Sequence, residues 1–291
     1  MGSRGTSACT LGHQDLFFTQ RTLSRILREN NEEPFFLPNG RSAYFAEDVL
    51  RPIGFERVDI MDVSAYEGAN VIHDLNLPVP PNMHESYDLI LDGGTLEHVF
   101  NFPAALENVM RMAKVGGDIL LISPANNYCG HGFYQVSPEL YFRMFVPENG
   151  FSLLRIYMAS GGLYYHIADP IDVHGRVELL ASEPALLMVH ARKVAHVPAK
   201  VRTPQQSDYV ALWQERLAEK EAKKQDGRFK AFVRERIRPE SVIAASKALN
   251  SLRLMLQFRR WRKRSRLSNR KFYVPVRQWN LTTRQAFESN Q

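Results

Sequence analysis

Short apolar runs alternate with longer segments of helical periodicity over the first two hundred residues of the chain. The runs predict strands at residues 57–63, 70–72, 87–91, 118–123 and 184–194. Apolar positions three and four residues apart predict helices at residues 14–30, 42–50, 103–113 and 138–145. Ser42 is a suitable N-cap for the second of these helices. Alternating strands and helices favour the α/β class, with a mostly parallel sheet that carries helices on both faces.

Polar residues and glycines stand where several of the predicted strands end. They are Asp62, Asp74, the stretch Asp92-Gly93-Gly94 and the loop of residues 123–127. In open α/β sheets, ligands bind outside the carboxyl ends of the strands, so we expect a ligand site there. The double glycine has two interpretations that the residues leave open: a tight turn, or a ligand that lies against the bare backbone.

The order of these stretches resembles that of the class I S-adenosylmethionine-dependent methyltransferases, in particular small-molecule O-methyltransferases. The resemblance covers about residues 34 to 195. It rests on Met61-Asp62-Val63-Ser64, His73-Asp74-Leu75-Asn76-Leu77-Pro78, Tyr87-Asp88-Leu89-Ile90, Leu96-Glu97-His98-Val99 and Gly116-Gly117-Asp118-Ile119-Leu120. It implies a Rossmann-like methyltransferase fold and S-adenosyl-L-methionine as the cofactor.

The resemblance also implies roles for single residues. Asp62 would bind the ribose hydroxyls and Asp74 the adenine amino group, whereas Asp92, Gly93 and Gly94 would flank the methionine part. A carboxylate suits a diol or an exocyclic amine, because it accepts two hydrogen bonds. We expect the first strand of the family at residues 34–37. The loop after it has a single glycine, Gly40, so the glycine-rich first motif is degenerate.

The acceptor side is expected in the loop of residues 123–135, which concentrates hydrogen-bonding groups in apolar surroundings. Asn126, Asn127 and Tyr134 are the candidates for substrate binding. His131 is the first candidate for a general base and His98 the second. A purely structural loop remains the alternative to a substrate loop.

Two further features of residues 1–199, a glycine-containing segment and a set of histidines, each have a functional and a structural interpretation. Residues 160–178 could form a lid over the pocket, with Gly161-Gly162 as its hinge, or an ordinary glycine loop. The spacing of His131, His166 and His174 matches no metal motif, so we expect no metal site.

Charge divides the chain into an acidic body and a basic tail. Residues 200–291 hold 23 Lys/Arg and 8 Asp/Glu, a net charge of +15. The whole chain is +6, which leaves −9 for residues 1–199. We therefore predict an N-terminal helical segment (1–33), a methyltransferase-like domain (34–199) and a basic, mainly helical extension (200–291).

The tail carries apolar positions at helical spacing over residues 208–237 and 240–266, and the second stretch ends in the basic run Arg259 to Arg266. Packing on the body is the ordinary interpretation. An anionic membrane or a protein partner comes second, and nucleic acid is less favoured because few aromatic residues interleave the charges. Two cysteines make no disulfide framework, so the cytoplasm is the expected compartment, with membrane association of the tail as an addition.

Together these observations predict a methyltransferase that acts on a small-molecule or sugar-like acceptor, by O-methylation. The alternative is a non-catalytic protein of the same fold that has lost the glycine-rich cofactor loop and serves as a binding or scaffolding module.

Overall fold

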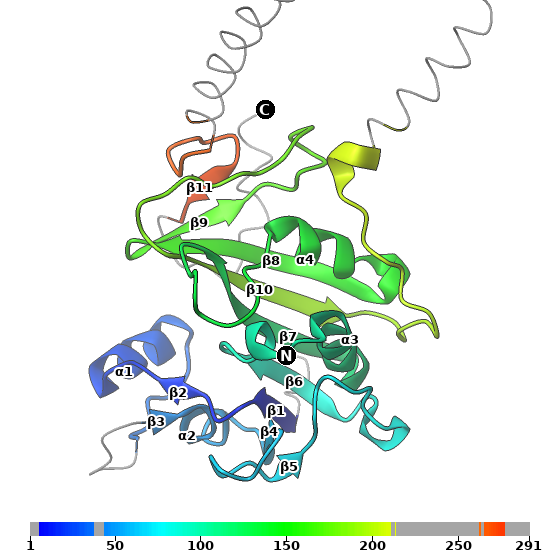
Figure 1. The fold of residues 1–291 in the computed structure, drawn as a ribbon. Coiled ribbons are helices and arrows are strands. Elements are labelled where there is room, and N and C mark those ends of the chain that lie inside the picture. Colours follow the sequence, from blue (N-terminus) through cyan, green and yellow to red (C-terminus); the bar gives the residue numbers. More distant parts are fainter. Residues whose placement is uncertain (1–5, 38–43, 211–212, 214–261, 263–264, 277–291) are drawn as a thin grey trace, which may run out of the picture.

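A nine-stranded sheet forms the centre of the molecule in the computed structural model, which describes residues 6–37, 44–210, 213, 262 and 265–276 (Figure 1). The strand order is β11-β9-β8-β10-β7-β6-β1-β4-β5. The strands of this sheet are β1 (Ser7–Leu11), β4 (Arg57–Asp62), β5 (Val71–Ile72), β6 (Tyr87–Asp92), β7 (Ala113–Asn126), β8 (Phe151–Ser160), β9 (Leu163–Ile167), β10 (Ala185–Lys193) and β11 (Tyr273–Pro275). The short strands β2 (Asp15–Leu16) and β3 (Tyr44–Phe45) pair separately.

The half of the sheet that runs from β5 to β7 is parallel. The chain begins in the middle of this half, at β1, continues on one side with β4 and β5, and then crosses to the other side with β6 and β7. The strand order therefore reverses between β1 and β6, where Leu11 pairs with Asp92. Such a reversal leaves a crevice at the carboxyl ends of the two strands, and it is the usual ligand site of this architecture.

The other half of the sheet is antiparallel. β10 lies between β7 and β8, and β8 and β9 form a hairpin. Gly161 and Gly162 make the two-residue turn of this hairpin, with φ of +57° and +73°. Positive φ at both turn positions matches the right-handed twist of the flanking strands and explains why both residues are glycine. These glycines therefore join two strands of the sheet and do not act as the hinge of a lid.

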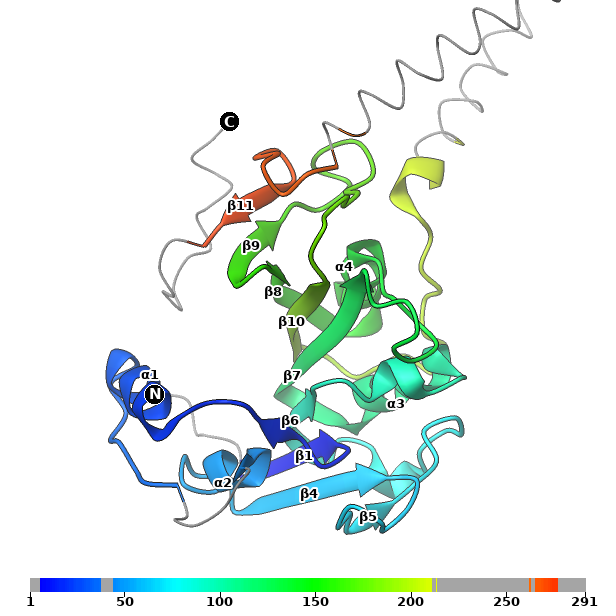
Figure 2. The same cartoon turned by 60° about the vertical axis from the view of Figure 1, so that its left-hand side comes forward.

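Helices cover both faces of the sheet (Figure 2). They are α1 (Gln20–Glu29), α2 (Ala46–Leu50), α3 (Phe102–Met112) and α4 (Pro138–Met144), with the 3₁₀ turns η1 (Pro81–Met83), η2 (Leu96–His98) and η3 (Pro147–Asn149). β1 is buried on both faces: Ala8 packs in a cluster with α2, whereas Cys9 and Leu11 belong to the large core under α3 and α4. The expected α/β architecture, a mostly parallel sheet between helices, is confirmed, because seven of the nine strands of the described sheet run in the same direction and only β9 and β10 oppose them.

The first strand is not where the sequence analysis expected it. Residues 34–37 form no strand, and the central strand β1 comes from Ser7–Leu11, within the segment assigned to an N-terminal helical unit. The misassignment has a physical cause, because Ser7, Ala8, Cys9 and Thr10 are small and do not form a run of large apolar side chains. The loop that follows the first strand is therefore Gly12-His13-Gln14, and it too has a single glycine.

Other elements begin at residues that differ from the predicted ones. α1 begins at Gln20, with the Thr19 side chain accepting a hydrogen bond from the Thr22 amide, because Asp15–Leu16 pairs with Tyr44–Phe45 as a short ribbon. α2 begins at Ala46, while Ser42, the expected cap, lies outside the described residues. Leu96–His98 form the 3₁₀ turn η2, and α3 follows at Phe102, one residue before its predicted start.

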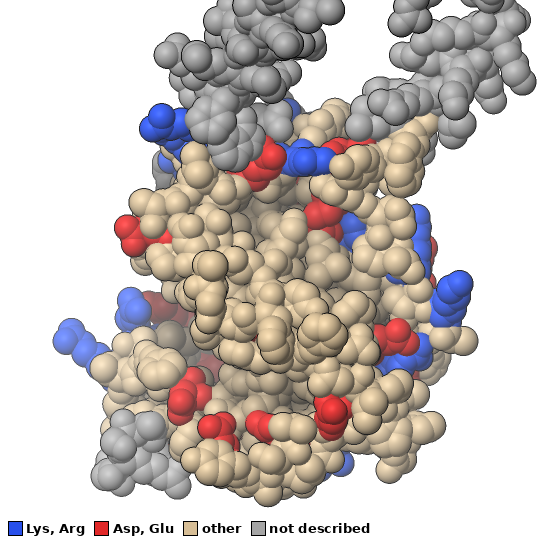
Figure 3. Space-filling model, in the orientation of Figure 1, with Lys and Arg blue, Asp and Glu red and all other residues tan. Residues whose placement is uncertain are grey.

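The predicted tail contributes one strand to the sheet. β11 pairs with β9, and the side chains of Phe272 and Tyr273 are buried. The two predicted tail helices lie almost entirely outside the described residues, as does most of the basic run. Among the described residues, no helix is long and apolar enough to cross a membrane. Acidic side chains gather along the lower part of the face seen in Figure 3, which is formed by the N-terminal third of the chain.

Candidate functional site

The switch point between β1 and β6, called the crevice below, is bordered by the residues that follow these two strands. Thr95 donates a hydrogen bond from its hydroxyl to the Leu11 carbonyl oxygen at 2.7 Å, which ties the loop after β6 to the end of β1. The Gln14 side chain donates to the same carbonyl and lies 3.4 Å from the Thr95 hydroxyl. Gly12 is bonded to the neighbouring strand through its amide, which donates to the Met61 carbonyl at 2.8 Å. The crevice is therefore closed at its base by short polar contacts between adjacent strand ends.

The two positions after β6 are glycines for different structural reasons. A Cβ atom on Gly93 would overlap the amide oxygen of the Gln14 side chain, so Gly93 leaves room for another residue of the crevice. Gly94 has φ of +130°, a conformation that residues with side chains rarely adopt. The turn thus requires the second glycine, and close approach within the crevice requires the first.

Asp62 ends β4 beside the crevice, as the sequence analysis predicted for a ribose-binding acid. One of its carboxylate oxygens accepts a hydrogen bond from the Val63 amide at 2.5 Å. The other lies about 4.0 Å from the position that a Cβ atom on Gly12 would take. The acid of the second strand in the parallel half and the glycine of the first therefore lie side by side, across the pair Leu11–Met61.

Asp74, the predicted adenine ligand, caps its own turn. Its Oδ1 accepts hydrogen bonds from the Asn76 amide at 2.9 Å and from the Asn76 side chain at 2.7 Å. These two hydrogen bonds hold the pKa of Asp74 below its usual value. The arrangement is the common Asx turn, and it fixes the loop that continues from β5 towards η1.

Asp92 is fully buried at the end of β6. Its Oδ1 accepts hydrogen bonds from the amides of Gly94, at 3.3 Å, and Thr95, at 2.8 Å, which shapes the double-glycine turn. Its Oδ2 has no hydrogen-bond partner among the described residues. Burial raises the pKa of Asp92 to about 7, and the nearby Glu97 carboxylate raises it as well, while the Thr95 amide opposes the change. Asp92 is therefore a structural acid of the site that holds its proton more tightly than usual.

Glu97 is the second buried acid of this region, with 2% of its surface exposed. The loop after β7 is pressed against it: the Phe133 amide donates to the Glu97 carbonyl at 2.8 Å, and a Cβ atom on Gly132 would collide with Glu97. The contact places His131 Nε2 at 3.4 Å from Glu97 Oε1. The rings of His98 and His131 meet edge to face at 5.1 Å between centroids. The two predicted base candidates, from distant parts of the sequence, are thus neighbours.

The predicted substrate residues are drawn into other contacts. Asn127 donates from its side chain to the carbonyls of Ala181 and Glu183, and the Tyr134 hydroxyl donates to the Phe100 carbonyl at 2.7 Å. Asn126 lines a cavity of about 290 Å³ beyond the end of β7. Because Asp92 pairs with Leu121, Asn126 lies five residues farther along β7, which is roughly 16 Å from the crevice. The assigned roles stay predictions, and the histidines lie nearer to the strand ends than Asn126 does.

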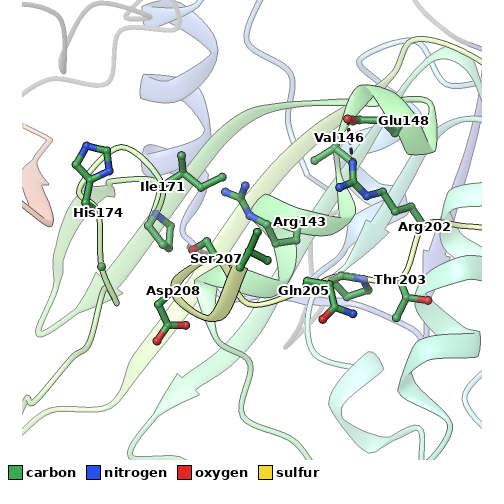
Figure 4. A pocket seen from close by; sticks show the side chains of 14 residues that line it. Arg143, Val146, Glu148, Ile171, His174, Arg202, Thr203, Gln205, Ser207 and Asp208 are labelled. Atoms are coloured by element: carbon green, nitrogen blue, oxygen red, sulfur yellow. Dashed lines mark hydrogen bonds and ion pairs between the residues drawn. The ribbon is translucent and has the colours of Figure 1, made fainter. Parts of the chain in front are cut away.

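A larger cavity, of about 810 Å³, opens elsewhere, between α4, the loop around Ile171 and the segment of residues 202–210. Figure 4 shows Arg143 projecting among these segments and the ion pair between Glu148 and Arg202 at one end. Arg143 is already paired with Asp169. The lining of this cavity includes none of the predicted site residues, so the crevice remains the candidate site.

Comparison with known proteins gives no match to a family model and none to a curated protein sequence. Among solved structures, the chain is similar to a provisionally assigned methyltransferase of Bacillus halodurans (14% identity, 61% of this chain, 99% of that one, TM-score 0.36). It is also similar to TehB of Haemophilus influenzae (16% identity, 66% of this chain, 58% of that one, TM-score 0.35). A third similar structure is a mutant of the 16S rRNA (adenine(1408)-N(1))-methyltransferase of Catenulisporales acidiphilia (12% identity, 67% of this chain, 87% of that one, TM-score 0.35). At TM-scores this low, these similarities carry no argument about the fold of this chain. The fold is assigned from the strand order and from the residues at the strand ends.

By that strand order, the chain has a Rossmann-like α/β fold with its switch point between β1 and β6. The sequence analysis found Asp62, Asp92 and the two glycines at its strand ends. It missed Gly12 and Gln14, because their strand was placed 27 residues too late, at residue 34 instead of Ser7. It also missed the pairing of Glu97 with the loop of residues 127–135, for which Gly132 was the available signal.

Proposed function

We propose that the crevice between β1 and β6 binds S-adenosyl-L-methionine and that the protein transfers its methyl group to a small-molecule or sugar-like acceptor. The observation that carries the proposal is the position of Asp62 beside Gly12, at the carboxyl ends of adjacent parallel strands next to the switch point. An acid in this place accepts hydrogen bonds from a ribose diol, and a glycine lets the nucleoside approach the backbone.

The residues of the chain divide the work of binding. Asp62 holds the ribose, Asp74 lies after β5 on the adenine side, and the turn of Asp92, Gly93 and Gly94 borders the methionine part. Bound cofactor supplies an activated methyl group on its sulfonium, so the protein mainly has to align the acceptor. A base on the acceptor side removes the proton of a hydroxyl, and His131 and His98 are the groups for this task.

Aromatic side chains border the histidine pair and support a small organic acceptor. Phe100 and Phe133 are 73% and 67% exposed, and their rings meet edge to face at 6.1 Å. Large apolar side chains next to hydrogen-bonding groups are typical of small-molecule sites. The 290 Å³ cavity at Asn126 is lined by polar groups such as Ser137 and Gln206, but it lies roughly 16 Å from the crevice, beyond the reach of a single sugar ring.

The proposal is tested by equilibrium dialysis of S-adenosylhomocysteine with the full-length protein. Asp62→Ala removes a charge-assisted hydrogen bond worth on the order of 1.5–3 kcal/mol, so binding should weaken about ten- to a hundredfold. Glu67→Ala, at an exposed acid five residues farther along the chain, is the matched control and should bind like the wild type. Equal affinity of the Asp62 and Glu67 variants would refute the assigned ribose site.

One observation favours the non-catalytic alternative. The loop after β1 has a single glycine, and the Gln14 side chain fills the space against Gly93 where the methionine part would approach. A scaffold of this fold has no need of an open crevice. The two functions are separated by Gln14→Ala: in the enzyme the Gln14 amide moves aside or contacts the ligand, so the substitution changes the affinity for S-adenosylhomocysteine. In the scaffold neither form binds the ligand.

A further inference from the structure

We propose that Glu97, His98 and His131 form a binding site for one divalent transition-metal ion, with zinc as the representative ion. These three side chains bring one carboxylate oxygen and two imidazole nitrogens within 4.8 Å of one another. Two of them come from η2, and the third comes from the loop after β7, so the fold assembles the cluster from separate segments. No metal site was expected from the sequence, because the spacing of His131, His166 and His174 matches no metal motif, and His166 and His174 are not part of this cluster.

The distances suit a metal of this class. A zinc ion bound to oxygen and nitrogen at about 2.0–2.1 Å in tetrahedral geometry separates its ligand atoms by about 3.3 Å. Glu97 Oε1 and His131 Nε2 are 3.4 Å apart. The ligand atom of His98, which is exposed at the end of η2, lies within 4.8 Å of the other two. Two histidines and one carboxylate form a set that zinc and ferrous iron both use, with at least one coordination position left open.

An independent observation points to a cation at this place. Glu97 is almost completely buried, and its Oε2 has no hydrogen-bond partner among the described residues. Burying a carboxylate without a partner is costly, and the cost falls when a cation lies next to it. The ion pair recorded for Glu97 within the described part of the chain is with His131, which is charged only when it is protonated. A metal ion would compensate the buried Glu97 carboxylate.

The surroundings hold the cluster in place. The hydrogen bond from the Phe133 amide to the Glu97 carbonyl fixes the loop, and the turn closed by the His131 amide and the Tyr128 carbonyl, at 3.0 Å, orients His131. Gly132 has φ of +69° and lies so close to Glu97 that a side chain there would separate the two segments. The ligand from the β7 loop is therefore positioned by backbone contacts with the segment that supplies the other two.

The chemistry of such an ion fits the side of the crevice where it lies. An open coordination position takes an oxygen ligand, and a bound divalent ion lowers the pKa of a hydroxyl or water. This role for the acceptor hydroxyl rests on the proposed function, in which the bound ion would take the place of His131 and His98 as the group that activates the hydroxyl, because their imidazoles would be metal ligands. Metal binding itself does not depend on the cofactor.

Calorimetric titration of zinc chloride into untagged, full-length protein, freed of metal by a chelator, tests the site. We expect saturable binding of one ion per chain. His131→Ala should weaken it by about tenfold or more, at least the loss seen when residues that merely orient metal ligands are changed. Glu97→Gln, which keeps the shape of the side chain, should have the same effect. His84→Ala, at an exposed histidine outside the cluster, should bind zinc like the wild type.

Absence of one-site binding, or equal affinity of the His131→Ala and His84→Ala variants, overturns the metal site. Because His131 is 53% exposed, its substitution leaves the fold intact, which circular dichroism verifies, and it decides the question even if Glu97→Gln unfolds. S-adenosylhomocysteine binding is measured separately in the presence of chelator. If the wild-type protein does not bind S-adenosylhomocysteine, the proposed function is refuted and the metal site is unaffected. Zinc binding without S-adenosylhomocysteine binding therefore supports the metal site alone.

Discussion

At the residue scale, the end of β6 concentrates the features that set this site apart. Asp92 and Glu97 are buried acids five residues apart, and each has one oxygen without a hydrogen-bond partner in the described part of the chain. Between them lie two glycines that fit the turn for separate reasons, one for Gln14 and one for its own backbone. The site is therefore built from two buried carboxyl groups and two glycines. Both features should affect the free energy of unfolding.

Asp92 should make stability depend on pH. Its pKa is raised from 3.8 to about 7 by burial, so between these values the folded protein holds a proton that the unfolded chain releases. Stability conferred by the protonated group is thus fully present below about pH 4 and is lost as the pH rises towards 7, by about 4 kcal/mol at most. Asp92→Asn should remove this contribution to the dependence of the unfolding free energy on pH. Thermal unfolding from pH 4 to 7 checks it, and parallel curves for the variant and the wild type would contradict it.

Gly94 tests whether the turn alone explains the double glycine. Because its φ is +130°, Gly94→Ala should destabilise the protein by about 1–3 kcal/mol. Gly175→Ala is the control, since Gly175 has open space for a Cβ atom and no positive φ, and surface changes of this kind stay within about 0.5 kcal/mol. Chemical unfolding of both variants measures the difference. If Gly94→Ala leaves stability unchanged, the glycine is bare for a ligand and not for the turn.

At the scale of elements, the sequence predicts those parts of the fold whose side chains repeat with a clear period. β4, β6, β10, α3 and α4 lie within one or two residues of their predicted positions. β1 was missed because its small residues are buried between two strands and show no large apolar run. β8 and β9 were missed although Gly161 and Gly162 mark their hairpin turn. The crevice depends on β1, so half of its lining could not be placed from the sequence.

β11 gives a prediction at this scale, because it brings a distant segment onto the sheet. Phe272 and Tyr273 are buried, and the Tyr273 hydroxyl donates to the Glu178 carbonyl at 3.0 Å. Phe272→Ala should therefore cost about 3–5 kcal/mol of unfolding free energy in the full-length protein. Leu163→Ala, at an exposed position of the adjacent β9, should cost far less. Urea unfolding decides, and similar midpoints for the two variants would show that the β11 segment does not pack as described.

At the scale of the whole molecule, the acidic body and the basic tail remain the most evident asymmetry of the chain. Residues 259–266 hold six Lys/Arg, and each contributes roughly 1 kcal/mol at most near an anionic surface, less at high salt. We predict that the full-length protein sediments with phosphatidylserine vesicles at low salt and is released at high salt. Replacing Arg259, Arg260 and Lys263 by Gln should abolish the sedimentation. A variant that still sediments like the wild type would assign the attachment to another surface.

The central claim about this protein is that the crevice between β1 and β6 binds S-adenosyl-L-methionine. Isothermal titration of wild-type, full-length protein with S-adenosylhomocysteine measures this without knowledge of the acceptor. We expect saturable binding of one ligand per chain, with an affinity that falls about ten- to a hundredfold in Asp62→Ala. Wild-type protein that releases no heat of binding at millimolar ligand would contradict it, and would leave a methyltransferase-fold scaffold in its place.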